Sequence, residues 1–276
     1  MEIYYVNHAG QRVDFTGENY KMLAVSDLFD YRWEYTTKGV SAFHIASFNK
    51  RFVERLVPLV ISAETKAEYY QKITILLEII DSDVSSAVPG RLYVGETYLQ
   101  CFFVASEKPK RYLNTRTTTI NLRLIAENGN WICEERKMFL PVAASVREDG
   151  LDYPHDYTFD FCSNLTNQRM VNSNYAASDF EMIIYGPCLN PAISVGMHTY
   201  EVEADLRTGE YMVVNSLAKK VYKTKNDGEQ VNLFYARGRD YYIFEKIPSG
   251  AVSVSWSGSF GFDITLLSER SEPVWI

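Results

Sequence analysis

The side chains that could act as acids, bases, nucleophiles or metal ligands are scattered along this 276-residue chain. Its four histidines, His8, His44, His155 and His198, lie in separate segments, and none belongs to an HExxH, GxSxG or phosphate-loop motif. His155 stands in a Pro-His-Asp loop and His198 near a strand start, so we interpret both as surface residues rather than catalytic bases. The sequence therefore predicts no catalytic, cofactor-binding or metal-binding residue, and we do not expect an enzyme.

Two local patterns could still carry chemistry. Glu201, Glu203 and Asp205 alternate with apolar residues, which places three carboxylates on one side of a strand. Clustered carboxylates can bind calcium or act on a glycosidic bond, but the solvent-facing side of a strand is the commoner use of this pattern. Residues 258–261 are rich in glycine, but no helix follows to direct amides at a phosphate, so we interpret them as a turn.

Tyrosine is unusually frequent, with 20 residues, and it suits both strands and interfaces. Tyr235, Tyr241, Tyr242 and Trp256 could stack on sugars if they lie on an open sheet face, although core packing is the commoner use of such residues. A standalone lectin-like carbohydrate-binding β-sandwich is therefore the alternative function.

The composition is typical of a globular protein, with 46% hydrophobic residues and a net charge of −7. The acidic excess lies mainly after residue 150, and it disfavours nucleic-acid binding. The cysteines are far apart, which favours reduced thiols; they are Cys101, Cys133, Cys162 and Cys188. No secretory signal opens the chain and no apolar run could span a bilayer, so we expect a soluble protein made in the cytosol, without membrane insertion.

One helix is expected over residues 65–81, with Ser62 as its cap and residues 81–83 at its end. Its apolar stripe recurs at helical spacing and consists of Tyr69, Ile73, Leu76, Leu77 and Ile80. This stripe should pack on a sheet, although the same face could dock a partner.

The other elements are short strands, so we expect a mainly β chain with one helix in the first half, an α+β fold. The clearest strands are the last two, over residues 252–256 and 260–266, where apolar and polar residues alternate strictly. Gly258-Ser259 between them predicts a tight hairpin.

We place a domain boundary in residues 141–156, where proline, glycine and charged residues break every period. This gives a first domain over residues 1–145 and a second over 146–276. In the second, strands with turns every 8–12 residues predict a β-sandwich. We expect residues 273–276 to leave that sandwich and pack near the domain junction.

Three segments near the end of the chain resemble the phage distal tail protein family: IPSGAVSVSW at 247–256, FGFDI at 260–264 and SERSEPVW at 268–275. Residues 187–193, 200–216 and 219–222 fit the same pattern. The first half is similar more loosely, through its opening strands, the helix near residue 70, and residues 90–93.

This resemblance implies a structural virion protein of the phage tail tip, synthesised in the bacterial host cytoplasm. Residues 1–145 would form a belt domain that closes a hexameric ring and joins the tail tube protein to the tail-associated (tail fibre or lysin-type) protein. Residues 146–276 would form a galectin-like sandwich that projects outward and can carry a receptor-binding protein. No cofactor and no sequence-specific nucleic acid is implied. The chain is too short to hold the inserted carbohydrate-binding modules of enlarged members.

Overall fold

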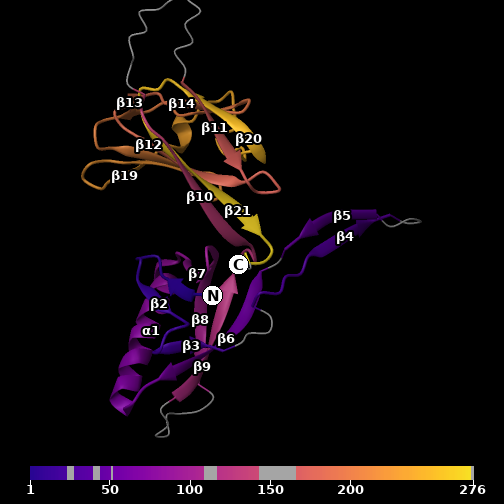
Figure 1. The fold of residues 1–276 in the computed structure, drawn as a ribbon, viewed down its shortest axis with the longest axis vertical. Helices are drawn as coiled ribbons and strands as arrows, with labels where there is room; N and C mark the ends of the chain where they lie inside the picture. Colours follow the sequence, from indigo (N-terminus) through magenta and orange to yellow (C-terminus); the bar gives the residue numbers. More distant parts are fainter. Residues whose placement is uncertain (24–27, 40–43, 51, 109–116, 143–165, 275–276) are drawn as a thin grey trace, which may run out of the picture. The chain divides into compact units, whose positions relative to one another are not determined.

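The computed structural model describes residues 1–23, 28–39, 44–50, 52–108, 117–142 and 166–274. Over these residues the chain is mainly β, with one α-helix in the first half, which confirms the predicted fold class (Figure 1). It divides into two compact units, of which the first comprises Met1–Cys133 and Glu269–Ile276 and the second Glu134–Ser268. The boundary expected at residues 145–146 lies outside the described residues. Within the described part, no helix is long and apolar enough to cross a membrane.

The first unit is built on antiparallel strands that share β8. These strands are β1 (Ile3–Val6), β2 (Arg12–Asp14), β3 (Tyr20–Met22), β6 (Val53–Ser62), β7 (Gly90–Val94), β8 (Thr97–Glu107) and β9 (Thr117–Ala126). The first half of β8 pairs with β7, which leads to β1 and β2, and its second half pairs with β9, which leads to β6 and β3. A register shift between Phe103 and Ala105 bends β8, and Phe103 packs edge to face on Tyr5 and Phe15 in the buried core.

Helix α1 (Lys66–Ser86) covers this core with the predicted stripe: Tyr69, Ile73, Leu76 and Ile80 are buried, while Leu77 is only partly buried. Both predicted ends need correction. Thr65, not Ser62, is the N-cap and accepts a hydrogen bond from the Glu68 amide, because Ser62 is still the last residue of β6.

The helix also continues beyond residues 81–83, since Asp83 points inward and is fully buried among hydrogen-bond donors. Its C-cap is Ala87, which has a left-handed φ of 52° and whose amide donates back to the carbonyls of Asp83 and Val84.

The second unit is a sandwich of two antiparallel sheets. One is the β19-β18-β17-β12-β21-β10 part of a 13-stranded sheet that continues from β10 to β8. The bounds of these six strands are Gln230–Asn232, Lys220–Thr224, Tyr211–Asn215, Asp179–Tyr185, Phe262–Arg270 and Trp131–Phe139. The other has the order β11-β20-β14-β15, with the bounds Thr166–Asn172, Gly250–Trp256, Ala192–Val195 and His198–Glu201. A short pair, β13 (Cys188–Leu189) and β16 (Asp205–Leu206), lies beside them, and a 3-10 turn, η1, spans Phe234–Ala236.

The core of the second unit corrects the predicted C-terminal hairpin. Both strands exist, but β20 pairs with β11 and β14, whereas β21 pairs with β12. The turn at Gly258 (φ 76°) carries the chain from one sheet to the other. Trp256 and Phe262 therefore meet edge to face across the core, with ring centroids 5.1 Å apart. A hairpin would instead have placed both apolar faces side by side in one sheet.

The chain crosses between the units twice, in β10 and in β21. Residues 269–274 therefore belong to the first unit, and Pro273 is buried. That residues 273–276 pack near the domain junction stays a prediction. Trp275 and Ile276 lie outside the described residues.

Candidate subunit-interaction site

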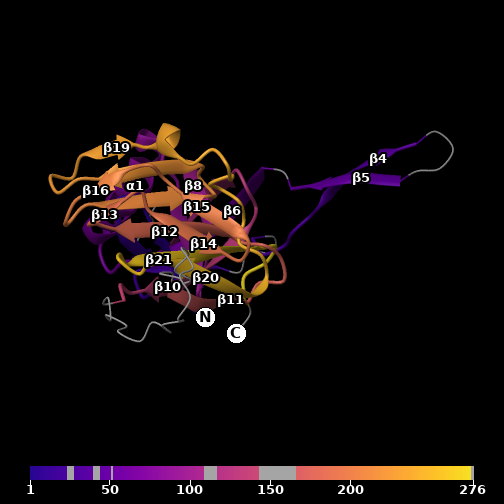
Figure 2. The same cartoon turned by 90° about the horizontal axis from the view of Figure 1, so that it is seen from above.

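One feature of the first unit leaves apolar side chains exposed: a two-stranded antiparallel sheet, here called the arm. It consists of β4 (Glu34–Lys38) and β5 (His44–Asn49), which pair with each other and, within the described chain, with no other strand (Figures 1 and 2). A two-stranded sheet of this kind is marginally stable in water unless something packs on it. Its two outer strand edges are also open to pairing.

The two faces of the arm differ in polarity. Tyr35 and Thr37 share one face of β4 by alternation, and they pair with Phe48 and Ile45. Phe48 and Ile45 share that face because the register shift leaves one extra residue, Ala46, between the two pairings. The opposite face is polar, with Thr36 and Ser47 joined by a hydrogen bond of 2.6 Å.

Tyr35, Ile45 and Phe48, which we call the arm's apolar face, are 64%, 57% and 58% exposed. Full burial of such a side chain contributes roughly 1.5–3 kcal/mol, so this face favours association.

Sequence reasoning recognised only part of the arm. The alternation of Tyr31, Trp33 and Tyr35 predicts a strand, but residues 36–58 carry no clean period and predict only a strand at their end. The irregularity has a structural reason, because the pairing shifts register between Thr36 and Thr37 and the arm has no buried face to impose a strict pattern. The signal that indicates the arm in the sequence is the pair of aromatic residues Tyr35 and Phe48, which lie before and after the polar Thr36–Lys38 stretch.

The most enzyme-like cluster of the described chain surrounds Asp83. Its carboxylate accepts hydrogen bonds from the Tyr5 hydroxyl, from the His8 amide at 2.8 Å and from His8 Nδ1 at 2.6 Å. Ser86 Oγ also lies 3.4 Å from His8 Nδ1. A nucleophile relay requires the acid and the hydroxyl on opposite ring nitrogens, whereas here both approach Nδ1. The cluster therefore ties the β1–β2 turn to the end of α1.

The other candidate residues are dispersed. His44 is exposed on the arm, and His155 lies outside the described residues. Glu201, Glu203 and Asp205 are partly or fully exposed while the residues between them are buried, so they form the solvent-facing side of this stretch. No group of three or more histidine, cysteine or acidic side chains in the described ranges could hold a metal ion.

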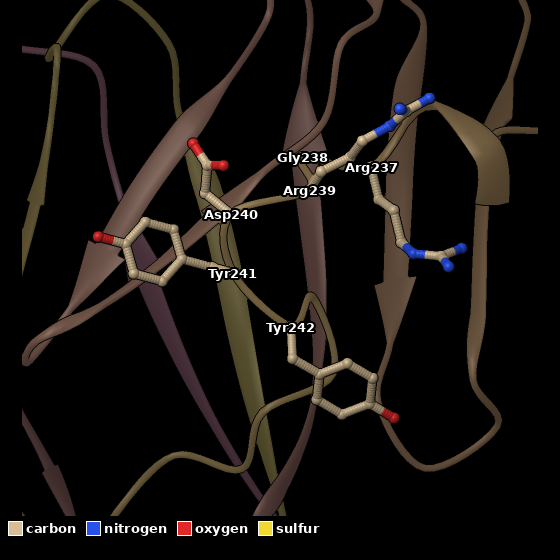
Figure 3. Close-up of a pocket in the computed structure, with 6 residues that line it drawn as sticks. All are labelled: Arg237, Gly238, Arg239, Asp240, Tyr241 and Tyr242. Atoms are coloured by element: carbon tan, nitrogen blue, oxygen red, sulfur yellow. The ribbon is translucent and has the colours of Figure 1, made fainter.

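A shallow depression of about 340 Å³ lies in the second unit, along residues 237–242. Its backbone is held by the hydrogen bond from Gly238 N to Glu201 O and by the contact of His198 Nε2 with Tyr242 O, both 2.9 Å. Figure 3 shows that Tyr241 and Tyr242 point in different directions, so the two rings do not enclose a common ligand position.

Trp256 is fully buried, and its Nε1 donates to Phe260 O. The prediction that it could stack on a sugar is therefore wrong. Tyr235, Tyr241 and Tyr242 are exposed, at 93%, 49% and 55%.

No protein-family model and no curated protein matches the sequence, but solved structures match the fold. The chain is similar to the Dit (gp 19.1) protein of phage SPP1, described as a paradigm of the hub adsorption apparatus in phages that infect Gram-positive bacteria; the TM-score is 0.59, the identity 10%, and 98% of each chain is covered. It is also similar to a chain of the phage P2 baseplate in its activated conformation, in structures with Ca and with Sr, at a TM-score of 0.66, identities of 12% and 14%, and 99% coverage of each chain. The chain thus shares its fold with SPP1 Dit and with a chain of the P2 baseplate, in line with the resemblance to phage distal tail proteins.

Proposed function

We propose that this chain is a distal tail protein, a structural component of a phage tail tip. The observation that carries the proposal is the match in fold over 98–99% of the chain to SPP1 Dit and to a chain of the P2 baseplate. Both matches extend over the first and the second unit, which supports a shared two-unit architecture. A standalone sandwich protein would match this chain over the second unit alone.

The arm gives this proposal a physical mechanism. A tail hub has to assemble from copies of one chain, and the arm's apolar face is a surface that a neighbouring copy would cover. We propose that six copies form a closed ring through the first unit, with each arm on the next copy. Closure matters because a head-to-tail contact that does not close would produce fibres.

The partners follow from the same proposal. The ring of first units would join the tail tube protein to the tail-associated protein below. The second unit would be the galectin-like domain that faces outward and can carry a receptor-binding protein. The protein would act in the virion, at the tail tip, after synthesis in the host cytoplasm, and its role would be structural rather than enzymatic.

The test is the mass of the purified protein in solution. Size-exclusion chromatography with light scattering should give about six times the 31.7 kDa mass of the chain. Electron microscopy of the same fraction should show rings with a central opening. A monomer that persists at high concentration, or an open filament, would refute the proposed hub.

A further inference from the structure

The base of the arm is held by one ammonium group. Lys50 follows directly after β5, and its Nζ lies 4.9 Å from the centroid of the Trp33 ring and 6.0 Å from that of Tyr31. Trp33 directly precedes β4, so Lys50 bridges the two chain segments that enter and leave the arm. A cation over an aromatic face within about 6 Å is attracted to it, more strongly when water is excluded.

The same ammonium group is tied to the body of the first unit. Lys50 Nζ donates a hydrogen bond to Asn130 Oδ1, in the turn between β9 and β10, and Asn130 Nδ2 donates to Glu269 Oε1 at 3.1 Å. These two bonds use the carbonyl and the amino ends of one side-chain amide, so they fix its orientation. The result is a relay, Lys50–Asn130–Glu269, that ends on β21.

A second contact at the same place strengthens this attachment. Phe29, on the incoming segment of the arm, packs on Trp131 with ring centroids 6.0 Å apart, and its neighbour Leu28 is buried in the core. Asn130 and Trp131 are adjacent, so the incoming and the outgoing segments of the arm meet the same turn.

Lys50 is also partly removed from water. Burial lowers the pKa of its ammonium group, and the charge of Glu269 opposes that shift. A lysine without a role would extend into solvent, where its charge is best hydrated. Here the ammonium group exchanges part of its hydration for two rings and an amide.

We propose that Lys50 is a positioning residue that fixes the direction of the arm through the Lys50–Asn130–Glu269 relay. The inference deepens the proposed function, on which its consequence for assembly rests: a fixed arm presents its apolar face at the angle that closes a ring. Glu269, the last member of the relay, is the first residue of β21 that belongs to the first unit.

The test measures the order of the arm directly. Spin labels are attached through K38C on the arm and E78C on the exposed side of α1, in dilute protein, and double electron–electron resonance gives the distance distribution between them. The test variants are Lys50→Met, which keeps the aliphatic stem, and Asn130→Ala. Lys50→Arg is the conservative rescue, because guanidinium also stacks on aromatic rings and donates to an amide oxygen. In all samples serine replaces Cys133, Cys162 and Cys188.

We expect one narrow distribution for the parent and for Lys50→Arg, and a broadened one for Lys50→Met and Asn130→Ala, at an unchanged thermal unfolding midpoint. Lys21→Met, which removes an exposed lysine on β3, is the matched control and should stay narrow. A Lys50→Met distribution that equals the parent's would overturn the proposal, as would a broad distribution in the parent.

The mass of the assembly, measured on the same variants, distinguishes the proposed ring from the proposed role of Lys50. A parent protein that is monomeric but has a narrow distance distribution would refute the ring and leave the role of Lys50 intact. A ring-forming parent with an arm that Lys50→Met does not loosen would refute only the relay.

Discussion

Replacing Tyr35 and Phe48 together by serine should dissociate the proposed ring without unfolding the chain. The two side chains pair directly across the arm, and 64% and 58% of their surfaces are open to solvent in the single chain. If a neighbouring copy buries that surface, each residue contributes roughly 1–2 kcal/mol to the free energy of association, which is about 60% of the contribution of a fully buried side chain. The double variant should therefore weaken each interface by roughly 2–4 kcal/mol, which is about 30- to 700-fold in the association constant.

The assay is light scattering over a dilution series, with thermal unfolding measured on the same samples. Ring mass should fall to monomer mass at concentrations where the parent is intact. The unfolding midpoint should hardly move, since changes of exposed residues usually alter stability by no more than about 0.5 kcal/mol.

Tyr235→Ser is the matched control, because this tyrosine is 93% exposed but lies in the second unit. The reasoning is refuted if the Tyr35/Phe48 variant keeps its ring at every dilution, or if the control dissociates equally.

Three further predictions concern the stability of the chain. Asp83→Ala should destabilise the first unit by about 3 kcal/mol, because it leaves the fully buried Tyr5 hydroxyl without its acceptor; hydrogen exchange of the α1 amides should rise accordingly, and unchanged protection would contradict this. Gly90→Ala should lower the free energy of unfolding by about 1–3 kcal/mol, since a Cβ there meets both the Tyr5 hydroxyl and the Asp83 carboxylate. Denaturant unfolding measures this loss, and Gly228→Ala, which introduces backbone strain but no contact, is the comparison. Burial raises the pKa of Tyr5 and of Tyr200 far above the usual value of about 10, so these hydroxyls lose their protons in the unfolded chain at a lower pH than in the folded chain. The free energy of unfolding should therefore fall as the pH rises above about 10. A spectrophotometric titration in which all 20 tyrosines of the folded protein ionise together would refute this.

The sequence was informative wherever a period reported which face of an element is buried. The stripe from Tyr69 to Ile80 predicted the helix, because apolar residues that recur every three or four positions share one face of an α-helix. Its ends were misplaced by a few residues, since the contacts that decide them come from β1 and β6, which are distant along the chain.

Strand pairing was harder to predict than strand position. The alternation in residues 252–256 and 262–266 specifies a buried face for each strand, but it carries no information about the neighbouring strand. A short turn with a glycine made the hairpin the simplest interpretation, and the sandwich core overrode it by placing Trp256 and Phe262 in opposite sheets.

The arm was missed as a site for the opposite reason. Patterns reveal what one chain buries in its own core, whereas Tyr35, Ile45 and Phe48 are apolar residues that this chain alone leaves in solvent. Surfaces that are completed by another molecule leave no periodic trace of their partner in the sequence. The two hydrogen bonds of the Lys50–Asn130–Glu269 relay join residues 80 and 139 positions apart, and only the folded chain brings them together.

The double crossing in β10 and β21 has a consequence for the order in which the protein is made. A ribosome produces all of Glu134–Ser268 before it produces Glu269–Ile276, the second segment of the first unit. The buried core of the first unit lies within residues 3–131 and that of the second within residues 139–266, so both cores can form before Glu269 is made. Glu269, the last member of the relay, arrives late in that sequence of events. The direction of the arm, which the proposed relay fixes, would therefore be set last, after both cores have formed.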